Sequence, residues 1–210
     1  MTYKELNAVK IRITLDDIEP PVWRQLVVPL TWRLDQLHLA IQAAFNWWNS
    51  HLHEFRVGGL RYGDPDGEDM TFEDSPRLFD EREVKLQDFS REQSVRFTYL
   101  YDFGDNWRHS VKIEELLALD IEPRLATCID GARARPPEDV GGVSGYAVFL
   151  KIMSDPFHPE HVEMKRWCGG HFDPEWFDLA IVDKDVRNAL RANVRRRLHQ
   201  PKPTNPSQES

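Results

Sequence analysis

The densest group of residues able to do chemistry is the segment YDFGDNWRH, residues 101–109. Its central Gly-Asp-Asn is typical of a tight turn, so we expect Asp102 and Asp105 to bracket the turn and His109 to lie on the returning strand. With His53 from another strand, two carboxylates and two imidazoles can bind a divalent ion or act as a general acid–base set. The structural alternative is that both aspartates accept hydrogen bonds from the turn and that His109 is a core residue.

A second candidate is the loop PPEDVGG, residues 136–142. Its prolines restrict the backbone and its paired glycines permit positive φ, so Glu138 and Asp139 are presented rigidly. Such a loop suits recognition of a cation or of backbone amides; alternatively, the two acids cap the following helix. Sequence spacing leaves open whether this loop lies beside the turn. If it does, the candidate pocket consists of His53, Tyr101, Asp102, Asp105, Trp107, His109, Glu138 and Asp139.

Cysteine and histidine have zinc-like spacing at Cys168-Gly-Gly-His171, and His158 and His161 can share one helix face. Cys128, the other cysteine of the chain, is a candidate further ligand together with this histidine pair. A zinc site normally uses two tight ligand pairs, and this set is incomplete. The intervening glycines serve equally well as a helix stop, so we assign no metal ligands.

Two further motifs are also incomplete. Carboxylates alternate over residues 64–69 as in calcium loops, but Ser75 stands where an EF-hand has its bidentate glutamate. No Gly-rich phosphate-binding motif is present, so nucleotide binding through such a loop is not indicated. The sequence therefore assigns no cofactor.

Apolar alternation predicts the strands that must position these groups. It predicts strands over residues 9–15, 22–28, 51–57, 95–103 and 107–113, the first two paired as a hairpin. A helix capped by Thr31 carries an apolar stripe as far as Trp48. Later helices are expected over residues 144–153, from 159 to 169, and after Asp173-Pro174. We therefore predict an α+β fold, with a mainly antiparallel sheet from N-terminal hairpins, one early helix and a helical C-terminal part.

The 210 residues carry a net charge of −8, with 40% hydrophobic and 11% aromatic side chains. This composition argues against a disordered chain and against a generally basic nucleic-acid coat. No apolar run reaches the ~18 residues of a membrane span. The first residues, MTYKELNAVKIRITL, lack the apolar core of a signal peptide, so we expect a cytoplasmic protein. We also expect one domain over residues 1–198 and a disordered polar tail over 199–210.

Charge is unevenly distributed along the chain. Residues 64–92 carry a net −7, whereas residues 183–198 carry a net +4 on a predicted final helix with an apolar stripe. Nucleic acid can therefore be contacted only at this helix, since the rest of the chain is acidic. The candidate contacts are Arg187, Arg191, Arg195, Arg196 and Arg197.

Five blocks in order resemble the plasmid pRiA4b ORF-3-like family. They are VWRQLVVPLTWRLDQLHLAIQAAFNW, HLHEFRVGG, YDFGDNWRHSVKIEE, PPEDVGGVSGY and FDPEWFDL, and the resemblance runs from about residue 8 to about residue 180. It implies an α+β fold and an intracellular protein carried on plasmids, mobile elements and chromosomes. Some members are labelled as resolvase-like passengers of an insertion element, but the family has no established reaction.

The residues do not support recombinase chemistry. A serine recombinase needs a nucleophilic serine among arginines near its N-terminus, and this region offers only Ser50, between Asn49 and His51. A tyrosine recombinase needs arginine and histidine around a late tyrosine, but the last one, Tyr146, precedes the basic helix.

Three functional hypotheses follow. The leading one is a non-catalytic binding or interaction module for a protein or small ligand, because rigid acidic and aromatic loops occur without a recognisable nucleophile. The first alternative is a metal-dependent hydrolase acting on phosphoesters, centred on the histidines, aspartates and glutamate of the candidate pocket. The second is a DNA-binding accessory protein of a mobile element, acting through the basic helix.

Overall fold

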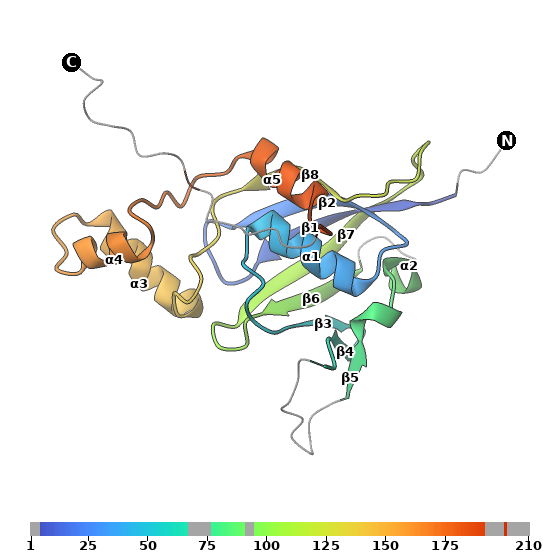
Figure 1. The fold of residues 1–210 in the computed structure, drawn as a ribbon, viewed down its shortest axis with the longest axis horizontal. Helices are drawn as coiled ribbons and strands as arrows, with labels where there is room; N and C mark the ends of the chain where they lie inside the picture. The colour runs from blue at the N-terminus through green and yellow to red at the C-terminus, as the bar shows by residue number, and fades with distance from the viewer. Residues whose placement is uncertain (1–4, 67–76, 91–94, 192–199, 201–210) are drawn as a thin grey trace.

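A twisted eight-stranded sheet forms the centre of the computed structural model, which describes residues 5–66, 77–90, 95–191 and 200 (Figure 1). The strands lie in the order β5-β4-β3-β6-β7-β1-β2-β8. All neighbours pair antiparallel except β4 and β5, which are parallel. The strands are β1 (Ala8–Leu15), β2 (Trp23–Pro29), β3 (His53–Val57), β4 (Leu60–Gly63), β5 (Leu78–Asp80), β6 (Arg96–Tyr101), β7 (Trp107–Leu117) and β8 (Thr127–Ala132).

The predicted hairpin of the first two strands is confirmed, with Ile11 opposite Leu26 in its register. Alternation explains which face of this hairpin is covered. Ile11 and Leu26 are fully buried, whereas Arg12, on the other face of β1, places its guanidinium over the ring of Trp23. One face of the sheet therefore supplies the core.

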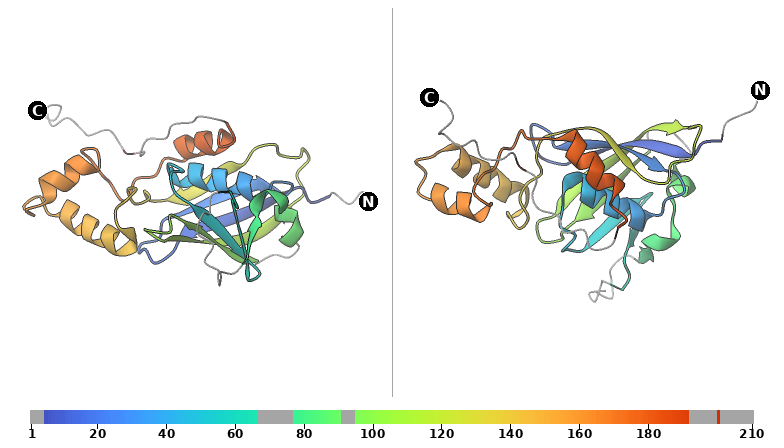
Figure 2. Two further views of the ribbon diagram at one scale, coloured as in Figure 1. Left: turned by 60° about the horizontal axis from the view of Figure 1, so that its bottom comes forward. Right: turned by 45° about the horizontal axis from the view of Figure 1, so that its top comes forward.

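Helix α1 (Leu34–Phe45) covers that face, and α5 (Leu179–Arg187) lies beside it and against β8 (Figures 1 and 2). Short turns η1 (Glu81–Glu83) and α2 (Leu86–Phe89) follow β5. Helices α3 (Gly142–Ser154) and α4 (His161–Trp167) pair with each other at one end of the molecule, away from the sheet (Figure 2). This arrangement confirms the α+β prediction.

Several predicted boundaries were wrong for local reasons. Helix α1 is not capped by Thr31; it begins after Arg33, whose backbone N–H donates to the side chain of Gln36. Asp173 accepts a hydrogen bond from the backbone of Glu175 in a turn, and Asp178 instead caps α5. Aspartate stabilises turns and helix starts by the same hydrogen bond, so the sequence signal was ambiguous.

The final helix is also shorter than predicted. It ends at Arg187, where the backbone N–H of Asn188 turns back to the carbonyl of Asp185. Of the expected stripe, Val186 and Leu190 are described, whereas residues 192–199 and most of the expected tail lie outside the described residues. Among the described helices, none combines the length and apolar character needed to cross a membrane.

Candidate functional site

The turn between β6 and β7 leaves one oxygen of Asp102 free of the backbone. Asp102 has a positive φ of 58°, and its Oδ1 accepts from the backbone N–H of Gly104 at 2.9 Å and of Asp105 at 3.3 Å. Its Oδ2 instead lies 3.7 Å from Nε2 of His51. The aspartate therefore has both roles that the sequence left open: it supports the turn and presents a carboxylate oxygen.

The loop at 136–142 is docked onto this turn. The backbone N–H of Gly141 donates to Oδ2 of Asp105 at 3.3 Å. A Cβ on Gly142 would lie 2.5 Å from the carbonyl oxygen of Asp105, so only glycine permits this close approach. The turn and the loop are therefore side by side, and Asp105 joins them rather than facing the carboxylate cluster.

Three carboxylates converge on one imidazole. From Nε2 of His51, the nearest oxygens lie at 3.4 Å for Asp139, 3.7 Å for Asp102 and 4.0 Å for Glu138. The ligand atoms of His51, Asp102 and Asp139 all lie within 4.8 Å of one another. Asp139 is 68% exposed at its side chain, whereas Glu138 is 2% exposed, so the cluster extends from the interior to solvent.

Glu138 has the most deeply buried side chain of this carboxylate cluster. Its Oε1 accepts from the backbone N–H of Trp48 at 2.7 Å and lies 3.9 Å from the guanidinium of Arg135, whereas its Oε2 accepts no hydrogen bond. Burial raises the pKa of Glu138, against the opposing effect of Arg135 and the Trp48 N–H. The site therefore contains a carboxylate oxygen that burial leaves without a partner.

His109 lies in the core rather than in the candidate pocket. Its Nδ1–H donates to the backbone oxygen of Trp107 at 3.0 Å, and its Nε2 accepts from the indole N–H of Trp47 at 3.3 Å. Full burial lowers the pKa of His109 to about 3. The imidazole is therefore neutral and cannot join the carboxylates.

His53 belongs to a different polar group. Its Nε2 lies 2.9 Å from Glu81, and its ring stacks on that of His38 with centroids 3.4 Å apart. The expectation that His53 faces the same pocket as Asp102 was wrong, because the chain does not extend as a strand through His51. Asn49 has a positive φ of 55°, and β3 begins only at His53.

Tyr101, at the end of β6, and Trp107, at the start of β7, lie on the buried side of the carboxylate cluster. Both are fully buried, and the hydroxyl of Tyr101 accepts from the backbone N–H of Ser50 at 3.1 Å. The ring of His51 stands edge-on to that of Tyr101, with centroids 5.8 Å apart. Tyr101 therefore positions the segment that carries His51, and Trp107 packs behind it against Trp47.

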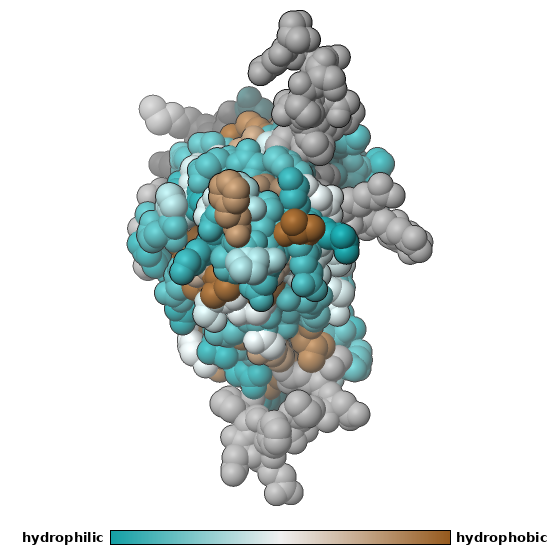
Figure 3. Space-filling model, turned by 90° about the vertical axis from the view of Figure 1, so that its left-hand side faces the viewer, coloured by the Kyte–Doolittle hydropathy of each residue, from teal (hydrophilic) through white to brown (hydrophobic). Residues whose placement is uncertain are grey.

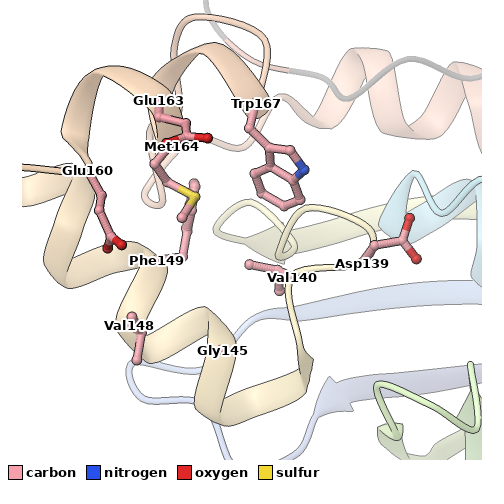
Figure 4. A pocket seen from close by; sticks show the side chains of 9 residues that line it. All are labelled: Asp139, Val140, Gly145, Val148, Phe149, Glu160, Glu163, Met164 and Trp167. Carbon is pink, nitrogen blue, oxygen red and sulfur yellow. The ribbon is translucent and has the colours of Figure 1, made fainter.

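A cavity of about 530 Å³ lies between this loop and the helix pair. Met164 and Trp167 reach from α4 toward Phe149 of α3 and Val140 of the loop, and Asp139 turns its carboxylate away from them (Figure 4). The other lining residues are Gly145, Val148, Glu160 and Glu163. A smaller cavity of about 190 Å³ adjoins it, because Asp139 and Trp167 line both.

The remaining candidate residues do not gather into sites. Cys128 lies in β8, and His161 on α4 bonds through Nδ1 to the carbonyl of Ile152. In the part of the chain that is described, no cluster of three or more potential metal ligands includes the cysteines, His158, His161 or His171. Of the calcium-like segment, only residues 64–66 are described, and both aspartates there pair with Arg82.

The basic end of the chain is partly neutralised. Arg187 pairs with Asp183 at 2.7 Å, and Arg191 is exposed. Arg195, Arg196 and Arg197 lie outside the described residues.

His51 is the functional candidate that sequence reasoning missed. It lies in the predicted strand over residues 51–57, of which only His53 was included in the candidate pocket. The signal was the Asn-Trp-Trp-Asn run that precedes it, because asparagine readily adopts positive φ and breaks the strand pattern.

Comparison with known proteins gives consistent matches. Residues 7–181 match the family described as plasmid pRiA4b ORF-3-like protein. The chain is 43% identical over 183 residues to "Uncharacterized protein y4hQ" of Sinorhizobium fredii (strain NBRC 101917 / NGR234), covering 86% of this chain and 91% of the relative. A crystal structure of MM3350, a protein of unknown function from Methanosarcina mazei Go1, is similar with a TM-score of 0.72 and 34% identity, covering 86% and 98% of the two chains.

Proposed function

The chain belongs to the plasmid pRiA4b ORF-3-like family, as its sequence blocks indicated, and we propose that it is a non-catalytic binding module for a small organic ammonium ion. The cavity between the loop and the α3–α4 pair is the binding site. The lining of that cavity carries the proposal.

Charge sets the class of ligand. Glu160 and Glu163 line the cavity, and none of its nine lining residues is a lysine, arginine or histidine. Two carboxylates at the rim of a partly apolar recess, with no basic side chain in its lining, favour a cation and oppose an anion. A phosphate or carboxylate ligand therefore fits this cavity poorly.

The apolar walls determine the shape of the ligand. Trp167 offers an indole face, to which an ammonium group is attracted by the ring quadrupole. Phe149 and Val148 provide fixed apolar surface, and Met164 is flexible enough to adapt to a ligand body. A volume of about 530 Å³ matches the cavities that hold small molecules.

The surrounding surface favours a small ligand over an extended apolar partner. At the end formed by α3 and α4, apolar residues appear as separate patches on a largely hydrophilic surface (Figure 3). The exposed apolar side chains of these helices and their connection are Val148, Phe157, Val162 and Trp167. Protein-binding faces of monomers are normally larger and contiguous.

Three probes that share one ring test the proposal. We expect 2-phenylethylamine to bind saturably in calorimetry at pH 7, whereas neutral 2-phenylethanol binds at least tenfold more weakly and phenylacetate does not bind. The titrations contain a chelator, so that the result is independent of any metal ion. Equal binding of all three probes, or none of the amine, contradicts the proposal.

Variants of the lining residues test whether the amine binds in this cavity. Glu160→Gln combined with Glu163→Gln should weaken amine binding by at least tenfold, and Trp167→Leu should do the same through loss of the indole face. Glu5→Gln combined with Glu122→Gln removes two exposed glutamates from other parts of the surface and is the matched control. Identical losses in the control and in the double variant would show that only the net charge matters.

A further inference from the structure

We propose that His51, Asp102, Glu138 and Asp139 form a binding site for a divalent transition-metal ion. This inference is distinct from the amine cavity, because it concerns a different kind of ligand and the two sites share only Asp139, whose carboxylate turns away from the cavity (Figure 4). The donors come from three separate parts of the chain, which the docking of Gly142 on Asp105 brings together.

The spacing of the donors fits an ion at their centre. Zinc ligands lie about 2.0–2.2 Å from the metal, which in a tetrahedral arrangement places neighbouring donor atoms about 3.4 Å apart. Nε2 of His51 lies 3.4 Å from Oδ1 of Asp139 and 3.7 Å from Oδ2 of Asp102. The ligand atoms of these three residues lie within 4.8 Å of one another, so side-chain rotation can bring them to one ion, and Glu138, 4.0 Å from His51, is the more distant fourth donor.

Glu138 supplies an independent indication of a cation. Its side chain is 2% exposed, and its Oε2 has no hydrogen-bond donor although it lies 4.0 Å from Nε2 of His51. A buried acceptor without a partner destabilises the fold, and more so when it is charged. Within the described residues, Arg135 is the only lysine or arginine within 4.0 Å of these carboxylates, and it approaches Oε1 instead.

The type of donor selects the metal. An imidazole among carboxylates favours Zn²⁺ or Mn²⁺, whereas an all-oxygen set suits Ca²⁺ and Mg²⁺. The side chains of His51 and Asp139 are 30% and 68% exposed, so an ion can enter from solvent. Glu138 and Asp139 also line the 190 Å³ cavity, which leaves room for water beside the metal.

Hydrogen bonds from the backbone hold the carboxylates of Asp102 and Glu138 in place. Oδ1 of Asp102 is fixed by two backbone N–H groups, which leaves Oδ2 for the ion. Oε1 of Glu138 is held by the Trp48 N–H, which similarly leaves Oε2. Such second interactions orient metal ligands before the metal arrives.

Titration of the untagged, chelator-treated protein with Zn²⁺ and with Mn²⁺ tests the site. We expect one ion per chain in calorimetry and a higher melting temperature with the metal present, because the ion binds the folded state. A stoichiometry below one-tenth, or no shift in melting temperature with either metal, overturns the proposal.

Matched aspartate variants separate the site from adventitious surface binding. Asp102→Asn keeps an oxygen for the turn and tolerates positive φ, so it should fold while weakening metal binding by at least tenfold. His51→Asn and Glu138→Gln should weaken it similarly. Asp105→Asn, in the same turn but bonded to Gly141, should leave binding within about twofold. Equal losses at Asp102 and Asp105 would contradict the site.

The two proposals fail separately. Amine binding is measured in chelator and metal binding without amine, so either can be absent while the other remains. Loss of metal binding in the His51→Asn variant with amine binding retained supports both assignments.

Discussion

The indole N–H of Trp47 donates to Nε2 of His109, 3.3 Å away, at the centre of the aromatic core. The other ring nitrogen of His109 donates to the backbone oxygen of Trp107. Both bonds form only with the neutral ring protonated at Nδ1, because a proton on Nε2 would face the proton of Trp47. The histidine that the sequence presented as a possible acid–base group is thus a hydrogen-bonded residue of the core.

This relationship predicts acid sensitivity. The pKa of His109 falls from 6.5 to about 3 on folding, so its contribution to stability is fully present above pH 6.5 and is lost as the pH falls toward 3. Each unit of difference corresponds to about 1.4 kcal/mol. The free energy of unfolding in urea should decrease clearly between pH 6.5 and pH 4.

The variant His109→Gln is the control for acid sensitivity. It does not titrate, so its stability should be lower at pH 7 but should change less between pH 6.5 and pH 4 than that of the unmodified protein. Parallel curves for the two proteins would show that other groups cause the acid effect.

The contact between Gly142 and Asp105 predicts a substitution that separates the loop from the turn. Gly142→Ala combines a positive φ of 66° with a Cβ placed 2.5 Å from a backbone oxygen. Gly58→Ala has a similar φ of 57° with nothing within 4 Å of the new Cβ. We expect a loss of about 1–2 kcal/mol at Gly58 from backbone strain and about 1–3 kcal/mol more at Gly142 from the clash.

Urea unfolding measures both losses, and metal titration follows the consequence for the cluster. Gly142→Ala should also weaken Zn²⁺ binding, since Asp139 is moved away from His51, whereas Gly58→Ala should not. Equal stability of the two variants would mean that the loop moves freely over the turn.

Arg135 and Glu138 predict a measurable coupling. Both side chains are buried, and the guanidinium of Arg135 donates to the carbonyl oxygens of Asn46 and Pro136 while lying over the ring of Trp47. Arg135→Met should cost about 3–5 kcal/mol, because it leaves the charge of Glu138 buried without a counter-ion. In a Glu138→Gln background, the same substitution should cost at least about 1 kcal/mol less.

Glu138→Gln by itself should be least harmful at alkaline pH. The pKa of Glu138 is raised on folding, so its protonated form stabilises the fold at low pH and this stability is lost as the pH rises through the folded pKa.

The double-mutant cycle of Arg135→Met and Glu138→Gln is measured by urea unfolding of the four proteins at pH 8. Strictly additive costs would mean that Arg135 acts only through the backbone carbonyls and Trp47.

Much of the fold follows from local pattern. The alternation over residues 9–15 and 107–113 predicted β1 and β7 because one face of each strand is buried. Strand β8 was missed, since Thr127–Ala132 shows no strong alternation and is held by pairing with β2, a hundred residues earlier in the chain. Its position depends on tertiary contacts that no local window contains.

The candidate site was only partly accessible to sequence reasoning. Asp102, Glu138 and Asp139 carried recognisable turn and loop signals, and the structure brings them within 4.0 Å of one histidine. The identity of that histidine depended on where β3 begins. The predicted strand began at residue 51, two residues before the observed start of β3 at His53. This difference decides which of the two histidines faces the carboxylates.

Helix α4 forms one wall of the amine cavity, yet none of its residues is buried. A short helix that contacts the core only through partly buried side chains such as Met164 can open without unfolding the sheet, so its amide protons should exchange with solvent faster than those of β1 or β7. Binding of an amine would then have to order this helix, which costs conformational entropy and lowers affinity while making the complex readily reversible. If the cavity binds an amine as proposed, α4 is the wall that should open most readily, and the bound amine should exchange quickly with solvent.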